Sequence, residues 1–126
     1  HVIGFKVEIS PNLSVFADRQ HFTSALANLT QNAVKFSHPG GKVILRGFLQ
    51  GDRAKIEIED ECGGLPKEKM KALFAPFEQM DINKSGLGLG LSISRRAIQL
   101  SDGEITARNL PGKGCVFTID LPGRNT

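Results

Sequence analysis

Residues 17–36 read ADRQHFTSALANLTQNAVKF and predict one helix whose two faces differ in chemistry. Asp18 is a candidate N-cap, and residues 39–41 (PGG) are expected to end the helix. Apolar residues recur along one face at three- and four-residue spacing, which is typical of a helix packed on a core: Phe22, Leu26, Leu29, Ala33 and Phe36. We therefore expect the fold to be organised around a helix from Asp18 to Phe36.

A second face of the same helix carries Asn28, Asn32 and Lys35, with Gln31 beside them. Asparagine is a poor residue for a helix interior because its side chain competes for backbone hydrogen bonds. Two asparagines one turn apart suggest neutral oxygen ligands for a hard cation, with a lysine near phosphate. A solvated helix face is the alternative, and the helix taken alone leaves both interpretations open.

The length of 126 residues is typical of one domain with its own core. The net charge of +3 fits an anionic ligand, but the sequence has no basic stripe or aromatic ladder typical of nucleic-acid binding. Cys62 and Cys115 make neither a metal-binding spacing nor a disulfide framework. Because no segment resembles a membrane-spanning helix or a signal peptide, we expect a cytoplasmic domain.

Short apolar runs bounded by turn residues predict strands at residues 2–9, 13–17, 42–49, 54–60, 104–109 and 115–121, several of them joined as hairpins. A short helix is expected at 67–73 and a long one at 88–100, ended by residues 101–103 (SDG). The pattern predicts an α/β (α+β) fold, a two-layer sandwich. It would have a mixed, mostly antiparallel sheet of about five strands, with about three helices on one face.

Asp60 ends a predicted strand and falls in phase with its core-facing residues Ala54, Ile56 and Ile58. An inward carboxylate needs a hydrogen-bond donor, because burying it unpaired is costly. Residues 61–64 (ECGG) follow with little side-chain bulk, so a flat ligand could lie there and offer an amino group. A structural cap or a salt bridge to an arginine elsewhere is the alternative; the glycines favour the ligand.

Residues 84–91 (KSGLGLGL) run directly into the second long helix. Backbone amides at a helix N-terminus, with glycines that allow close approach, form a site for phosphate. The spacing matches neither the dinucleotide fingerprint nor a P-loop. Close packing of the helix on the sheet is the structural alternative, and it applies to Gly90.

Together these segments resemble the catalytic ATP-binding domain of sensor histidine kinases, in the superfamily shared with gyrase, mismatch-repair ATPases and a heat-shock chaperone. Any one segment would be weak evidence, but four boxes and a closing strand in this order are specific. They are ALANLTQNAVKFSHPGG (25–41) for the N box, ECGGLP (61–66) for the first glycine box, LFAPFEQ (73–79) for the phenylalanine box, GLGLGLSIS (86–94) for the second glycine box, and GKGCVFTIDLP (112–122) for the closing strand.

The resemblance implies roles for individual residues. Asn32 would ligate Mg²⁺ with help from Asn28, Lys35 would contact phosphate, and Asn32 and Lys35 would be the catalytic pair. Asp60 would accept a hydrogen bond from the adenine amino group. The other implied contacts of ATP are Phe36, Gly64, Lys84, Gly86, Leu87 and Gly88.

The resemblance also implies a mobile lid over the nucleotide, from about residue 67 to 86, with Phe74 and Phe77 anchoring it. Two departures from the family pattern stand out. Cys62 replaces the first glycine of the Asp-x-Gly-x-Gly box and places a thiol near the expected adenine site. Asn28 stands where ATP-hydrolysing branches carry a general-base glutamate, which favours phosphoryl transfer to a protein over hydrolysis.

None of His1, His21 and His38 lies in a segment that resembles the family's phosphoacceptor box, and His21 is expected to be structural. We therefore expect residues 1–126 to be a single catalytic domain, monomeric alone, with the dimerisation and phosphoacceptor domain absent from this chain. The expected function is binding of Mg·ATP and transfer of the γ-phosphoryl to a histidine on that separate helical domain.

The implied setting is two-component signalling, with a response regulator as an indirect partner and a full-length protein that could sit at the inner membrane. Two alternatives remain open. One is a protein-serine kinase or ATPase of the same superfamily. The other is a degenerate, non-catalytic nucleotide-binding module, which Cys62 keeps in consideration.

Overall fold

α1 (Arg19–Phe36) forms where the apolar stripe predicts it. Asp18 is its N-cap, and one carboxylate oxygen accepts a hydrogen bond from the backbone N–H of His21 at 2.9 Å. The helix ends at Ser37, whose backbone N–H donates to the carbonyl of Ala33. The buried side of α1 carries Ala25, Leu29 and Ala33.

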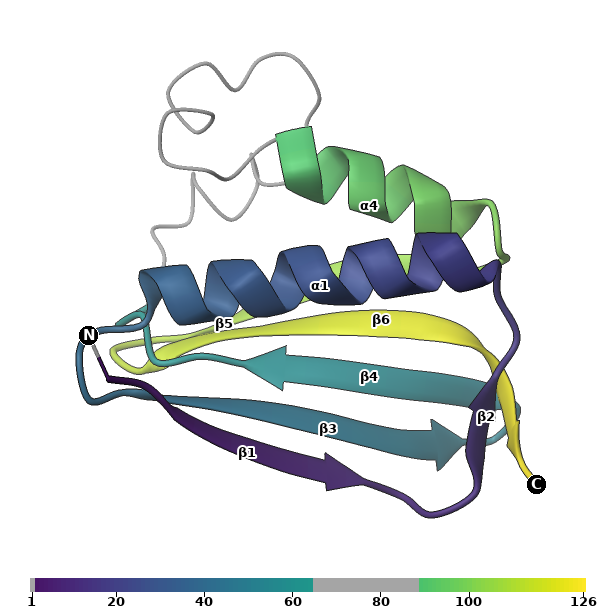
Figure 1. Ribbon diagram of the computed structural model, residues 1–126, viewed down its shortest axis with the longest axis horizontal. Coiled ribbons are helices and arrows are strands. Elements are labelled where there is room, and N and C mark those ends of the chain that lie inside the picture. Colours follow the sequence, from purple (N-terminus) through teal and green to yellow (C-terminus); the bar gives the residue numbers. More distant parts are fainter. Residues whose placement is uncertain (1, 65–88) are drawn as a thin grey trace.

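The computed structural model describes residues 2–64 and 89–126, which form one sheet with two helices on one face (Figure 1). The two-layer α+β architecture expected from the sequence is confirmed, and the described residues contain six strands where about five were expected. The expected short helix at 67–73 lies outside the described residues. Besides α1, the elements are β1 (Gly4–Ile9), β2 (Leu13–Val15), β3 (Lys42–Gln50), β4 (Arg53–Glu59), α4 (Leu89–Gln99), β5 (Glu104–Leu110) and β6 (Gly114–Asn125).

The sheet runs in the order β1-β3-β4-β6-β2, with β5 paired to β6. The β1–β3 pair is parallel and the other pairs are antiparallel, as the expected mixed sheet requires. β6 is longer than the predicted 115–121. Its first part lies between β4 and β5, and residues 123–125 pair with β2. β6 therefore takes part in three of the five strand pairings of the described sheet.

The helix-side face of β4 carries Ala54, Ile56 and Ile58, all buried, as the alternating pattern predicts. Glu59 is also buried, on the opposite face of the sheet. Its carboxylate pairs with Arg46 of β3 at 2.9 Å and with Lys113 at 3.4 Å. A buried carboxylate on this face is therefore satisfied by two cations.

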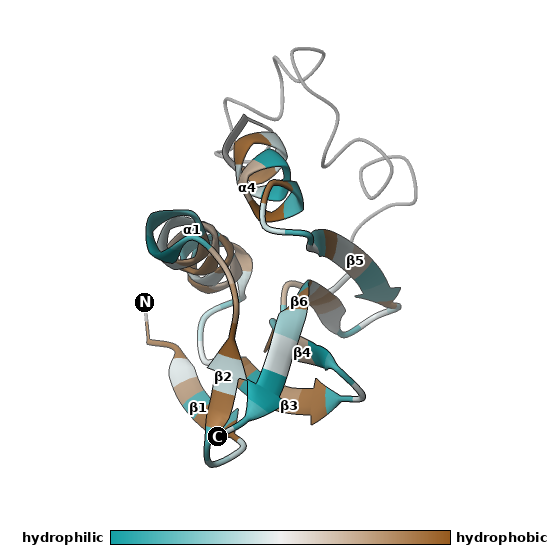
Figure 2. Ribbon diagram, turned by 90° about the vertical axis from the view of Figure 1, so that its right-hand side faces the viewer, coloured by the Kyte–Doolittle hydropathy of each residue, from teal (hydrophilic) through white to brown (hydrophobic). Residues whose placement is uncertain are grey.

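α4 packs beside α1 on the same face of the sheet, next to β5 (Figure 2). Arg95 in α4 pairs with Glu104 at the start of β5 at 2.7 Å. The helix ends as predicted: the N–H of Gly103 donates to the carbonyl of Ile98, and Asp102 adopts a positive φ of 59°. Within residues 2–64 and 89–126, no helix has the length and apolar character needed to cross a membrane.

Candidate functional site

The end of β4 and the end of α1 meet at one edge of the sheet. The backbone N–H of Glu61 donates to the hydroxyl of Ser37 at 3.1 Å, and the N–H of His38 donates to the carbonyl of Glu61 at 3.2 Å. These bonds tie the segment after β4 to the residue that caps α1. The last turns of α1, which carry the predicted polar face, therefore lie near Asp60.

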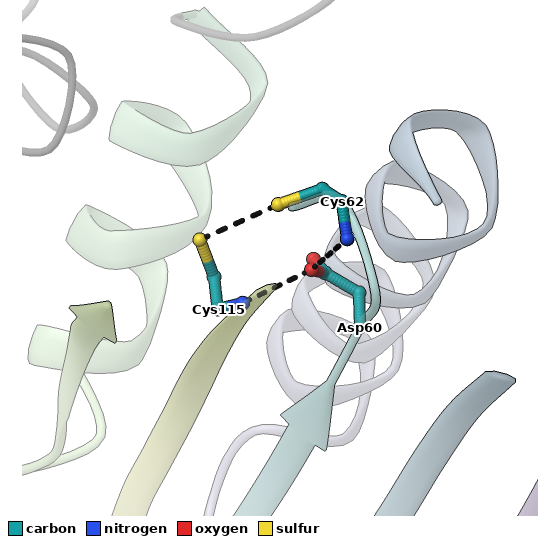
Figure 3. Close-up of side chains that lie close together, drawn as sticks. All are labelled: Asp60, Cys62 and Cys115. Atoms are coloured by element: carbon teal, nitrogen blue, oxygen red, sulfur yellow. Dashed lines mark hydrogen bonds between the residues drawn. The ribbon is translucent and has the colours of Figure 1, made fainter. Parts of the chain in front are cut away.

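Asp60 is buried, with only 3% of its surface exposed. One carboxylate oxygen, Oδ1, accepts hydrogen bonds from the backbone N–H groups of Cys62 at 3.2 Å and of Cys115 at 3.1 Å (Figure 3). Burial raises the pKa of this carboxyl above its ordinary value, although the two amides and the Cys62 thiol favour the charged form. Within the described ranges, no lysine or arginine forms an ion pair with Asp60. Backbone amides therefore cap the carboxylate of Asp60, as the structural alternative expected. Within the described residues, no arginine forms the alternative salt bridge with it.

Gly114 allows the backbone of Asp60 to come close to the start of β6. A Cβ at this position would overlap the carbonyl oxygen of Asp60. The N–H of Asp60 also donates to the carbonyl of Cys115 at 3.0 Å. Gly114 and Cys115, the first two residues of β6, therefore fix the positions of both the backbone and the carboxylate of Asp60.

Gly63 and Gly64 both adopt positive φ, 89° and 92°, a region that favours glycine. The N–H of Gly63 donates to the carbonyl of Lys113 at 3.0 Å. A side chain at Gly64 would also press on the Asn109 side chain, 3.2 Å from the position of its Cβ. Backbone geometry explains both glycines, and at Gly64 the lack of a side chain also matters.

Asn28 and Asn32 are half-buried on α1. The side-chain N–H of Asn28 donates to the hydroxyl of Ser94 in α4 at 2.9 Å, and Ser94 is itself buried. This bond uses the amide nitrogen of Asn28 as the donor, so the side-chain oxygen of Asn28 takes no part in it. The arrangement is compatible with an oxygen ligand for a hard cation, and it also gives Asn28 a structural part.

Lys35 is exposed, and its Nζ lies 5.3 Å from the centroid of the Phe36 ring. Phe36 is half-buried and packs against the core. The ammonium group thus reaches solvent at the end of α1. The remaining predicted ligands, Lys84, Gly86, Leu87 and Gly88, lie outside the described residues, as do the expected lid and its two phenylalanines.

Four residues that support this site were not identified from the sequence as site residues. Ser94 and Ser37 supply hydroxyl partners for Asn28 and for the backbone of Glu61. Gly114 and Cys115 position Asp60. The two glycines at 112 and 114 are a sequence signal for a close approach of two backbone segments. Nothing in the local sequence pattern distinguishes the two serines.

The family described as "Histidine kinase-, DNA gyrase B-, and HSP90-like ATPase" matches residues 17–125, a stretch that holds Asp60 and the polar face of α1. The chain belongs to this family, and within it to the catalytic ATP-binding domains of sensor histidine kinases.

Two similar proteins are bacterial sensor kinases. The alginate biosynthesis sensor protein KinB of Pseudomonas aeruginosa is 39% identical over 105 residues, which cover 83% of this chain and 18% of KinB. The circadian input-output histidine kinase CikA of Synechococcus elongatus is 35% identical over 121 residues, 92% of this chain and 16% of CikA. The chain therefore spans less than a fifth of the length of either relative.

Solved structures share the fold. The mycobacterial sensor histidine kinase MprB has a TM-score of 0.84 and 29% identity, covering 98% of this chain and 84% of the MprB chain. The nucleotide-free catalytic domain of the histidine kinase ThkA has a TM-score of 0.84 and 30% identity, covering 95% of this chain and 78% of that chain. Both likenesses cover at least 95% of this chain.

Proposed function

We propose that this chain binds Mg·ATP and transfers the γ-phosphoryl group to a histidine on a separate helical dimerisation and phosphoacceptor domain. The observation that carries the proposal is the carboxylate of Asp60. It is buried at the sheet edge, and the two backbone amides that hold it both bond to Oδ1. The other oxygen, Oδ2, receives neither amide and can accept from the amino group of adenine.

The adenine-side residues follow from this placement. Gly63 and Gly64 keep side-chain bulk away from the segment after Asp60. Phe36 packs at the same edge and would lie beside the base. On the basis of the sequence, the phosphates would meet Lys84 and the backbone at Gly86, Leu87 and Gly88.

Asn28 and Asn32 would hold Mg²⁺ through their side-chain oxygens, because neutral oxygen ligands suit this hard cation. When bound, Mg²⁺ would neutralise charge on the phosphates. The bond from Asn28 to Ser94 restricts the orientation of the Asn28 amide. Lys35, exposed at the end of the same helix, would add positive charge at the transferred phosphoryl group.

Transfer to a protein, and not to water, is supported by the chemistry of Asn28. Its amide cannot act as a general base, and its nitrogen is occupied in the bond to Ser94. This chain would act by positioning and charge neutralisation, while the partner's histidine supplies the nucleophile. In two-component signalling, the phosphoryl group would then pass from that histidine to a response regulator.

The test is phosphoryl transfer in trans. The assay mixes this chain with labelled Mg·ATP and with the dimerisation and phosphoacceptor domain of the same kinase, which is supplied as a separate polypeptide. We expect an acid-labile, alkali-stable phosphoprotein on the acceptor only, at low yield because the two domains are not linked. The matched controls are this chain with Asn32→Ala, and the acceptor with its histidine replaced.

Other outcomes of this assay would support one of the alternative functions. Steady ATP hydrolysis by this chain alone would contradict the proposal and indicate the ATPase branch. An acid-stable product would indicate a serine kinase. Tight ATP binding with no labelling under any condition would indicate the degenerate module.

A further inference from the structure

Asp60, Cys62 and Cys115 form a cluster that the proposed function does not use as a unit. The two sulfur atoms lie 3.7 Å apart and point toward one another between α1 and α4 (Figure 3). One potential ligand atom from each of the three residues lies within 4.8 Å of those of the other two. The cysteines are 53 residues apart in sequence, so their spacing gives no metal motif.

We propose that this cluster is a binding site for a thiophilic divalent cation of the zinc class, with Asp60, Cys62 and Cys115 as its three protein ligands. Zinc accepts cysteine sulfur and carboxylate oxygen together, and three protein ligands leave a fourth position for water. On binding, the two thiols lose their protons to solvent and form two metal–sulfur bonds, while the carboxylate of Asp60 forms a metal–oxygen bond.

The distance between the sulfurs favours a metal site. With zinc–sulfur bonds of about 2.3 Å at a tetrahedral angle, two thiolates on one ion lie about 3.8 Å apart. The observed separation is 3.7 Å, so the side chains already have the required spacing. A disulfide would instead need the sulfurs to approach to about 2.0 Å.

The backbone holds the ligands in a rigid frame. The amides of Cys62 and Cys115 both donate to Oδ1 of Asp60, and the amide of Asp60 donates to the carbonyl of Cys115. These bonds fix all three residues relative to one another before any ion binds. Cys115 is buried, whereas Cys62 is partly exposed, so the ion enters on the Cys62 side.

The site depends on the residue in which this chain departs from the family pattern. A glycine in place of Cys62 would remove one of the two cysteine sulfurs of the cluster. The cation would also engage the carboxylate proposed for adenine, so zinc and ATP should compete. This second part rests on the proposed function; the metal site itself does not.

The first experiment measures metal binding to the whole chain with a phosphine reductant present, so that disulfide formation cannot contribute. Cd²⁺ should produce the ultraviolet absorption of cadmium thiolate, saturating at one equivalent, and Zn²⁺ should displace it. Cys62→Gly should abolish the absorption and weaken Zn²⁺ binding at least about tenfold. Cys115→Ala is the second variant, with its folding checked by circular dichroism.

A lack of thiolate absorption in the wild type would overturn the metal site. Equal Zn²⁺ affinity of the wild type and Cys62→Gly would also overturn it, because the ion would then sit elsewhere, for example on histidines.

The second experiment measures ATP affinity of zinc-loaded protein after gel filtration has removed unbound zinc, since ATP chelates the ion. We expect affinity to fall about tenfold in the wild type and to stay unchanged in Cys62→Gly. Zinc binding without any change in ATP affinity would contradict the shared carboxylate. Failure of the metal-free wild type to bind ATP would contradict the proposed function and leave the metal site supported by the first experiment.

Discussion

Gly114 lies so close to the backbone of Asp60 that the methyl group of an alanine would overlap the Asp60 carbonyl oxygen. The contact joins the start of β6 to the end of β4. The amide of Cys115, one residue later, donates to the carboxylate of Asp60. The residue proposed to recognise adenine is therefore positioned by a strand that begins 54 residues after it.

Gly114→Ala should displace Asp60, because the two nearest atoms, the carbonyl oxygen and carbon of Asp60, are backbone and cannot rotate away. We expect a loss of stability of about 2 kcal/mol and a loss of ATP affinity of at least about tenfold. The matched control is Gly4→Ala, where a Cβ would meet only ordinary contacts of 3.8 and 3.9 Å. Chemical denaturation and ATP titration of both variants measure the effect. Equal behaviour of the two variants would show that the β6 contact does not position Asp60.

Asp60→Asn should retain the fold but lose adenine selection. The asparagine oxygen can still accept from the amides of Cys62 and Cys115. The other position then presents an N–H to the adenine amino group, which is itself a donor. We expect ATP affinity to fall about tenfold or more, with the preference over GTP reduced. Unchanged affinity and preference in competition binding would rule out the adenine role.

The same variant should change how stability depends on pH. Burial raises the pKa of Asp60 above the ordinary 3.8, so the folded protein holds this proton more tightly than the unfolded chain. Its contribution to stability is complete below the unfolded pKa and is lost as pH rises through the folded pKa. Asp60→Asn should therefore be at least as stable as wild type at neutral pH, and this advantage should shrink as pH falls below the raised pKa. Thermal melts across that range check the sign, and an advantage that grows on acidification would contradict it.

Asn28 and Asn32 should behave differently although they are one turn apart. Asn28→Ala leaves the buried Ser94 without this partner, so we expect a loss of stability of about 1 kcal/mol. Asn32→Ala should leave stability near wild type but remove most of the Mg²⁺ enhancement of ATP binding. Ser94→Ala completes a double-mutant cycle with Asn28→Ala. A large loss of stability in Asn32→Ala, with unchanged metal dependence, would support a purely structural helix face.

Arg46→Met should destabilise the fold by about 1–3 kcal/mol, because it removes the nearer of two cations from the buried Glu59. Burial alone would raise the pKa of Glu59, but its bond to Arg46 and the charges of Arg46 and Lys113 outweigh this and lower it. That stabilisation is present above the unfolded pKa and is lost as pH falls through the folded pKa. Lys6→Met, from an exposed pair 4.0 Å from Glu8, is the control and should cost almost nothing. Urea denaturation at neutral and acidic pH distinguishes the two, and an equal cost would contradict the prediction.

Local pattern was sufficient for the elements and for the inward placement of Asp60. The cap at Asp18 and the stripe below it place α1, because helix periodicity and capping involve residues a few positions apart. Strand alternation likewise places Asp60 on the inner face, since that face is set by counting in twos from Ile58. The two-layer fold follows from the order of these elements.

Contacts between distant segments could be decided only by the folded sheet. Three contacts join residues more than 50 positions apart. They are the hydrogen bond of Asn28 to Ser94, the close approach of Gly114 to the backbone of Asp60, and the contact between the sulfurs of Cys62 and Cys115. The parallel pairing of β1 with β3 joins segments closer in sequence, and it too is decided only by the folded sheet. Such contacts depend on strand register and helix placement, which are set by packing of the whole core and leave no periodic trace in the chain. The two cysteines looked unrelated by spacing, and they meet because β4 and β6 are neighbours in the sheet.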